Sequence, residues 1–299
     1  MFDILQYSFI QNAFVAGSFV AVIAAIIGYF LVVRGLTFAG HALSHIGFAG
    51  AAGAVLLGID PVFGLLVFTT SAAISIGLLG KEIRERDVSI GVIIAFALGL
   101  GILFLSLYHG YAEQAYSILF GTILGISQTD VLVTATFSLI MLVLLIVLFR
   151  PLLFSSFDPE VAQARGVPVR LLSVLFLLLV AVTVSISVQV VGVMLIFTLL
   201  VGPAATATRL ARRPFNALIL SVLLGLSYTW LGIFLAAYQG TWPVSFFIAA
   251  IAFTVYLPVR LLSPLWQKRP SSSRIPAEPI QFSTSHPEHE TAHAALQRS

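Results

Sequence analysis

Residues 38–53 read FAGHALSHIGFAGAAG, and this stretch decides how the rest of the chain is interpreted. It lies within a hydrophobic segment long enough to cross a bilayer, yet it carries two histidines, His41 and His45. Residues four apart on a helix lie on the same face, one turn from each other. Because ionisable groups are costly inside a membrane, the pair predicts a functional site on a membrane helix.

The composition of the chain is typical of a polytopic membrane protein. Of its 299 residues, 59% are hydrophobic and 9% are charged, whereas soluble domains have about 45–50% and about 25%. The chain has no cysteine, which excludes disulfides, thiolate metal sites and cysteine nucleophiles. We expect no nucleic-acid partner, because the basic residues lie beside hydrophobic segments, and no cleavable signal peptide, because the N-terminus lacks a basic region.

Apolar segments of about 20 residues predict an all-α fold with about nine transmembrane helices. A further apolar piece, residues 115–126, is too short to span and predicts an interfacial or re-entrant helix. Polar residues replace the apolar pattern near residue 267, so we predict a transmembrane permease domain over 1–265 and a disordered cytoplasmic tail over 266–299. The nine segments are residues 9–33, 36–57, 61–80, 88–108, 129–149, 169–189, 191–208, 215–237 and 244–262.

The basic residues predict the orientation of these segments in a cell membrane. With nine spans, every Lys and Arg falls on one side, which the positive-inside rule makes cytoplasmic. The N-terminus is then outside and the C-terminus inside. The fifteen basic residues are Arg34, Lys81, Arg84, Arg86, Arg150, Arg165, Arg170, Arg209, Arg212, Arg213, Arg260, Lys268, Arg269, Arg274 and Arg298.

One cytoplasmic connection predicts a short, self-capped helix that docks a partner. Asp158 is a good N-cap and Pro159 suits the first helical position, while Gly166 can take the left-handed conformation that ends a helix. The open alternative is a plain amphipathic connector. The residues of this predicted docking element are Asp158, Pro159, Glu160, Val161, Ala162, Arg165 and Gly166.

Gly202 and Pro203 lie deep in a predicted span, and proline removes one helix hydrogen bond there. We expect a kink or a break that lines a pathway, with a simple packing kink as the alternative. In the tail, His286, His289 and His293 have a spacing that could bind a divalent metal weakly, and a solvated tail is the alternative.

Two enzymatic interpretations of the sequence fail. The zinc metallopeptidase motif needs a glutamate directly after its first histidine, and Ala42 occupies that position. A phosphate-binding loop also fails, because Gly80-Lys81 is followed by Glu82 and Ser75 stands where the first glycine belongs. We therefore expect no enzymatic activity in this chain.

The depth of the two histidines favours a metal pathway. At 1.5 Å per residue from Arg34, His41 lies about 10 Å and His45 about 16 Å into a core roughly 30 Å thick. Neutral imidazole binds Zn²⁺ well and other first-row divalent ions less selectively. Two ligands do not complete a site, so the others must come from other spans, a partner subunit or water. Histidines that merely hydrogen-bond neighbouring helices are the alternative.

Four stretches carry motifs of one known family. The segment from Arg34 to His45 resembles a basic residue followed by Gly-Asp-Ala-Leu-Ser-His, and Val190 to Ala207 resembles a second signature. Leu119 to Gly125 and Asp158 to Val167 resemble two more. Together they resemble the membrane permeases of zinc/manganese-type ABC importers, the ABC-3 family, over about residues 8–265.

The resemblance implies a homodimeric inner-membrane permease with a central pathway, driven by two cytoplasmic ATPase subunits and supplied by an extracytoplasmic solute-binding protein. It implies no permanently bound cofactor, with Zn²⁺ or Mn²⁺ as transported substrate, and makes Pro159 to Arg165 the coupling helix. In related permeases the Asp and His of the first motif bind the metal. The His corresponds to His45, but His41 replaces the Asp. Loss of that carboxylate favours Zn²⁺ over Mn²⁺ or iron.

Other transport classes stay open from the sequence. A secondary metal-ion transporter would need no ATPase, but no Asp or Glu lies in the interior of a predicted span to relay protons, and Asp130 stands at the edge of the segment 129–149. An ABC importer permease for a chelated-metal cofactor has a related architecture, and the histidines favour a bare ion over it. An intramembrane enzyme is disfavoured by Ala42.

Overall fold

The computed structural model describes residues 7–78, 83–108, 117–121 and 123–266 of the chain. Within these residues the structure is helical and contains no strand, so the predicted all-α class is confirmed. Residues 1–263 form one compact unit. The predicted tail begins at residue 266, which instead ends helix α11 (Val244–Trp266), and residues 267–299, with His286, His289 and His293, lie outside the described residues.

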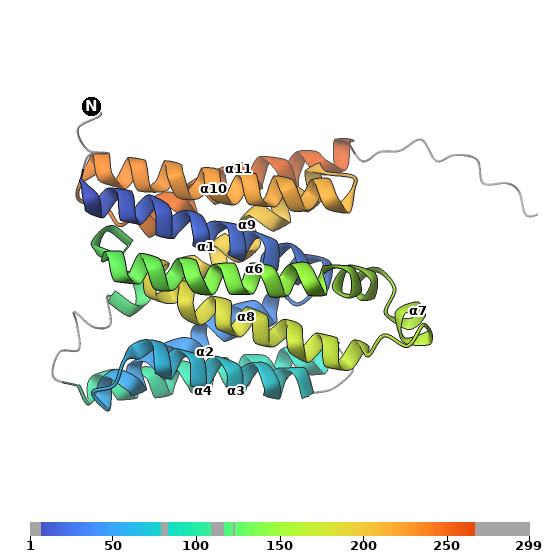
Figure 1. Cartoon of the computed structure of the whole chain (residues 1–299), viewed down its shortest axis with the longest axis horizontal. Coiled ribbons are helices and arrows are strands. Elements are labelled where there is room, and N and C mark those ends of the chain that lie inside the picture. The colour runs from blue at the N-terminus through green and yellow to red at the C-terminus, as the bar shows by residue number, and fades with distance from the viewer. Residues whose placement is uncertain (1–6, 79–82, 109–116, 122, 267–299) are drawn as a thin grey trace, which may run out of the picture. The chain divides into compact units, whose positions relative to one another are not determined.

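Nine helices of at least 18 residues run through the described part of the chain, in the order that the sequence predicts (Figure 1). Two short helices join them: the 3₁₀ helix η2 (Ile123–Gly125) and α7 (Pro159–Ala164). The long helices are α1 (Ser8–Val33), α2 (Thr37–Leu56), α3 (Pro61–Leu78), α4 (Ile83–Ser106), α6 (Gln128–Phe157), α8 (Val169–Val191), α9 (Val193–Leu210), α10 (Pro214–Gln239) and α11 (Val244–Trp266).

Helix α2 differs from the other eight long helices, which are apolar enough to cross a membrane by length and composition. His41 and His45 and several glycines lower its hydropathy. It contacts α3, α4, α8 and α9, and most of its residues are buried. Because protein rather than lipid surrounds α2, the helix tolerates polar groups that a lipid-facing helix would not.

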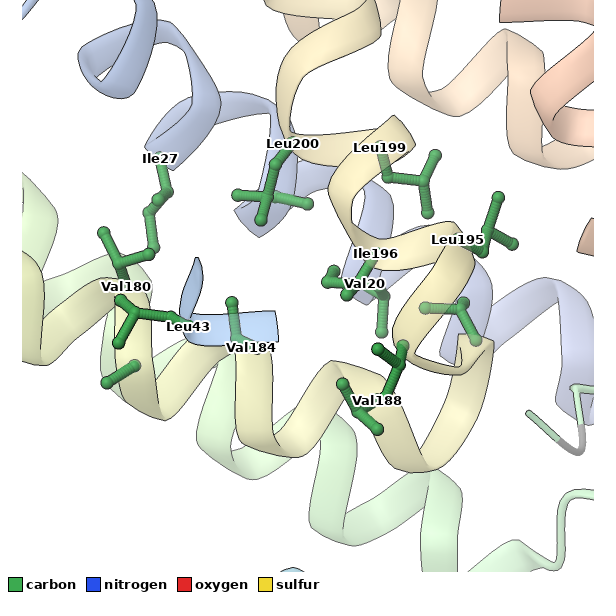
Figure 2. Packing of buried hydrophobic residues seen from close by; sticks show 14 of the residues in the cluster. Val20, Ile27, Leu43, Val180, Val184, Val188, Leu195, Ile196, Leu199 and Leu200 are labelled. Atoms are coloured by element: carbon green, nitrogen blue, oxygen red, sulfur yellow. The ribbon is translucent and has the colours of Figure 1, made fainter. Parts of the chain in front are cut away.

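The helices approach each other closely where glycine replaces larger side chains. A Cβ added at Gly28 of α1 would overlap the carbonyl oxygen of Leu200 on α9. Gly50 of α2 and Gly64 of α3 cross in the same way. Such small-residue crossings are how membrane helices gain packing contacts without a hydrophobic driving force. Figure 2 shows the resulting core, in which side chains of α1, α2, α8 and α9 meet.

Polar contacts add to this packing inside the bundle. The hydroxyl groups of Thr69 on α3 and Ser185 on α8 are 2.7 Å apart and fully buried. On α10, Ser221 donates to the carbonyl of Ala25 on α1 at 3.1 Å. Buried polar groups in a membrane need such partners, so these bonds fix which helix faces meet.

Helices α6 and α9 depart from the prediction in different ways. Helix α6 continues through Pro151 to Phe157, eight residues past the predicted end at 149, because a single proline in a 30-residue helix removes only one hydrogen bond. Helix α9 also continues through Gly202 and Pro203, so the predicted break does not interrupt the helix. The interruption lies at Gly192, between α8 and α9, where φ is +81°.

The interfacial or re-entrant helix predicted over 115–126 is described only in part. Residues 109–116 and 122 lie outside the described residues, and η2 occupies the end of the segment. Asn12 of α1 donates to the carbonyl of Ile126 at 3.1 Å. Gly121 (φ +74°) packs against the backbone of Gly192, so this segment contacts the junction of α8 and α9.

Candidate functional site

A three-residue turn sets the register of the histidine helix. Gly35, at φ +65°, reverses the chain directly after α1, and the amide of Leu36 donates to the carbonyl of Leu31 at 2.8 Å. The side chain of Leu31 then packs against Gly40, next to His41. The positive φ explains why glycine stands at position 35. The start of α2 is thereby fixed to the end of α1.

His41 and His45 lie together on one face of α2. Their ring centroids are 4.2 Å apart, and both side chains are half-buried. The predicted juxtaposition is therefore present in the structure. A spacing of this size allows two imidazoles to bind one ion.

The hydrogen bonding of His45 leaves one of its nitrogens free to bind a metal. Its Nδ1 lies 3.2 Å from the backbone carbonyl oxygen of His41. A carbonyl oxygen only accepts, so Nδ1 must carry the proton and the Nε2 lone pair stays available. A backbone carbonyl in this role also fixes the orientation of a ligating ring.

His41 has a different environment. Its Nδ1 is buried and has no hydrogen-bond partner among the described residues. The ring of Phe197 on α9 packs edge-on against the imidazole at 4.6 Å between centroids. An unpartnered buried nitrogen is costly, and ligation of a metal ion would satisfy it.

His41 and His45 are the two candidate side-chain ligands at this position among the described residues. No group of three or more His, Asp or Glu side chains with metal-binding geometry occurs among them. Water, backbone carbonyls or residues outside this chain must complete any coordination sphere. Such an open site suits a transported ion better than a structural one.

The predicted docking helix has the geometry that its sequence dictates. The carboxylate of Asp158 accepts from the amide of Val161 at 2.9 Å, and Pro159 occupies the first helical position of α7. Gly166 has φ +81°, and the guanidinium of Arg165 lies 5.9 Å from the ring of Phe154. Glu160 is in the first turn, and Ala162 is the buried residue of the helix. These contacts establish the helix and its caps, whereas docking of a partner on α7 is part of the proposed function.

The structure adds contacts that no local motif predicts. From the sequence, Arg34 indicates membrane orientation and opens the first family motif, but the structure adds that its guanidinium donates to Ser155 of α6 and Ser173 of α8. These partners are 121 and 139 residues away in the chain. The only signal in the sequence is a serine near the end of α6 and another near the start of α8.

Comparison with known proteins decides the family. A family model described as "ABC 3 transport family" matches residues 6–263. The chain belongs to this family. It is accordingly a multi-pass membrane protein and the permease of an ABC metal importer, a transport protein rather than a catalyst.

Curated relatives in bacteria are similar over most of the chain. The manganese transport system membrane protein MntC of Halalkalibacterium halodurans is 34% identical over 233 residues, which cover 78% of this chain and 80% of that protein. The manganese import system permease protein ScaB of Streptococcus parasanguinis is 33% identical over 231 residues, covering 77% and 82%.

Solved structures share the fold. PsaBC from Streptococcus pneumoniae, determined in complex with a Fab, has a TM-score of 0.76 and 30% identity, and the match covers 87% of this chain and 96% of that one. A second structure, described as an inward-facing conformation of a putative metal-chelate type ABC transporter, has a TM-score of 0.66 at 16% identity. At that identity it shows the fold alone.

Proposed function

We propose that this permease moves a divalent first-row metal ion across the membrane through the His41–His45 site. The observation that carries the proposal is the pair of imidazoles 4.2 Å apart on α2, with Nε2 of His45 free and Nδ1 of His41 unpartnered. Neutral imidazole is a strong ligand for such ions. Two ligands hold an ion without enclosing it, as a transport site requires.

The identity of the metal is the finer part of the proposal. Several relatives are named for manganese transport or import. This chain, however, has His41 where the resembled family has an aspartate, and a two-imidazole site without a carboxylate favours a borderline ion. We propose Zn²⁺ as the preferred cargo over Mn²⁺, because the ligands at the site outweigh the names of relatives 33–34% identical.

The proposal includes partners and orientation. Two copies of the chain would form the pathway, cytoplasmic ATPase subunits would dock on α7, and an extracytoplasmic solute-binding protein would deliver the ion. The N-terminus would be outside and the C-terminus cytoplasmic. Side-chain contacts support placing the basic residues on one side of the membrane. Arg34 contacts the end of α6 and the start of α8, which flank α7, and Nη1 of Arg209 lies 3.5 Å from Oγ of Ser263 near the end of α11.

Uptake by the reconstituted complex tests this function. The permease and its ATPase are placed in proteoliposomes, and ⁶⁵Zn²⁺ and ⁵⁴Mn²⁺ uptake is measured with ATP, without ATP and with excess chelator. ATP-dependent zinc uptake that the chelator abolishes and that manganese competes with poorly is expected. Uptake without ATP would indicate a secondary transporter, and uptake only of the chelated metal would indicate a chelate importer. Either result would contradict the proposal.

A further inference from the structure

Arg34 joins three helices at the cytoplasmic end that the sequence predicts. It follows α1 directly, and its Nη1 and Nη2 donate to Ser155 Oγ of α6 at 3.2 Å and to Ser173 Oγ of α8 at 2.8 Å. We call these three residues the inner clamp. A planar guanidinium holds two acceptors in a fixed fork, which a lysine ammonium does not.

The two serines are oriented to receive these bonds. The hydroxyl of Ser155 donates to the carbonyl of Leu152 at 3.2 Å, and that of Ser173 donates to the carbonyl of Val169 at 2.9 Å. With its proton engaged in its own helix, each oxygen presents its lone pairs to Arg34. Ser155 is 2% exposed, so water does not replace the guanidinium there.

An aromatic cluster beneath the clamp joins the same three helices. The guanidinium carbon of Arg34 lies 5.4 Å from the centroid of the Phe176 ring on α8. Phe30 of α1 packs against Phe176 at 6.2 Å and against Phe149 of α6 at 5.8 Å. Apolar surroundings strengthen the hydrogen bonds of a charged group.

The clamp brackets helix α7. Ser155 lies two residues before the end of α6, and Ser173 lies in the second turn of α8, so α7 and its two connections form the loop between them. Helix α7 contacts both α6 and α8. A displacement of α7 therefore acts on the two helices that carry these serines.

The inner clamp is also connected to α2, the helix that carries the two histidines. Arg34 is seven residues before His41, and the turn between them is held by Leu36 and Gly35. Leu31, one turn before Arg34 on α1, packs against Gly40 beside His41. Arg34 thus links the two helices that contact α7 to the start of α2, the part of that helix that carries His41.

We propose that Arg34 is a positioning residue that transmits displacement of α7 to His41 and His45. The proposal rests on the function proposed above, in which α7 docks the ATPase and the histidines bind the ion. Arg34 touches neither the ion nor the ATPase. It makes the two helix ends around α7 and the start of α2 move as one body.

The test compares Arg34→Gln and Arg34→Lys with Arg260→Gln, which removes the same charge from an exposed site on α11. Zinc uptake and ATP hydrolysis are measured together in proteoliposomes, and zinc binding is measured on the purified complex. We expect Arg34→Gln to lower zinc taken up per ATP about tenfold or more, within the ~5–150-fold range of coupling between sites. The zinc taken up per ATP by Arg34→Lys should lie between that of Arg34→Gln and that of the wild type, and Arg260→Gln should keep the wild-type value. Zinc affinity and ATPase association should be unchanged in all three variants.

Unchanged uptake per ATP in Arg34→Gln would overturn the proposal, and so would a parallel loss of zinc binding or of ATPase association, which would make Arg34 a general structural residue. If Arg34→Gln fails to accumulate in the membrane, the double variant Ser155→Ala/Ser173→Ala decides, because it keeps Arg34 and removes its acceptors. A similar fall in zinc taken up per ATP supports the proposal, and a wild-type value overturns it. A wild-type complex that takes up no metal contradicts the proposed function itself.

Discussion

His41 and His45 are chemically alike but differ in what surrounds them. The ring of His45 is oriented by a carbonyl in its own helix, whereas the Nδ1 of His41 has no partner among the described residues. His41 also occupies the position where the resembled family has a carboxylate. In the proposed function, the oriented ring of His45 is the fixed ligand, and the residue at position 41 sets the preference between metals.

Replacing His41 by aspartate tests that division at the residue scale. We expect His41→Asp to shift the ratio of zinc to manganese uptake towards manganese by about tenfold, or ~1.4 kcal/mol, because a carboxylate is the harder ligand. Competition between the two isotopes in proteoliposomes measures the ratio. His41→Gln is the control, since it removes the imidazole without adding charge and should reduce uptake of both ions. An unchanged ratio in His41→Asp would refute the role of position 41.

Gly28 provides a second residue-scale prediction, on stability. A methyl group at this position would overlap the carbonyl of Leu200, so Gly28→Ala forces α1 and α9 apart. Overpacking of this kind costs about 1–3 kcal/mol. Gly91→Ala on α4 is the matched control, because no atom lies within 4 Å of its added Cβ. Thermal unfolding in detergent should show a lower midpoint for Gly28→Ala alone. Equal midpoints would contradict the close crossing.

At the scale of elements, the caps of α7 are the feature to test. Asp158 accepts from the amide of Val161, and loss of an N-cap costs about 1 kcal/mol, which is large for a six-residue helix. We expect Asp158→Ala to weaken ATPase co-purification and metal-stimulated hydrolysis. Asp60→Ala removes a similar bond, to the amide of Val62 at the start of α3. The second variant should retain both activities, and loss of both in the two variants would indicate a general stability effect.

Local chemistry explains which elements the sequence could predict. The helix α7 is specified by Asp158, Pro159 and Gly166, which act within a few residues of each other. The facing of His41 and His45 follows from helical spacing alone. Both features are present in the structure.

Features that depend on tertiary packing were beyond local rules. Pro203 was expected to kink or break its helix, and α9 continues through it without a break while the proline is buried. The sequence predicts the junction of α8 and α9 near residue 190 but not the packing of Gly192 against Gly121, and the bonds of Arg34 reach residues more than a hundred positions away. No periodicity encodes such pairings.

At the scale of the whole molecule, nine long helices follow from hydropathy, although α2 is less apolar than the others. The sequence predicts α2 as a ninth span because of its length. With nine spans, every Lys and Arg falls on one side of the membrane, which agrees with that prediction. The second copy, the ATPase and the binding protein lie outside this chain, so their contacts with it are proposals.

Membrane topology is testable because the chain has no natural cysteine. We introduce single cysteines at Thr241, in the exposed α10–α11 loop, and at Gln163, on the exposed side of α7. With the N-terminus outside, a membrane-impermeant maleimide should label Thr241→Cys in intact cells and Gln163→Cys only after permeabilisation. The opposite pattern would invert the topology and remove α7 from the cytoplasmic side.

The central claim is that the histidine pair on α2 carries the ion. Zinc uptake by purified, reconstituted complex with His45→Ala tests it most directly, with Thr241→Ala in the exposed α10–α11 loop as a control away from the site. We predict that ATP-dependent uptake falls at least about tenfold in His45→Ala, since loss of an oriented ligand costs more than ~1.4 kcal/mol, and is unchanged in Thr241→Ala. Wild-type uptake by His45→Ala, in complexes of equal amount and ATPase content, would contradict the claim.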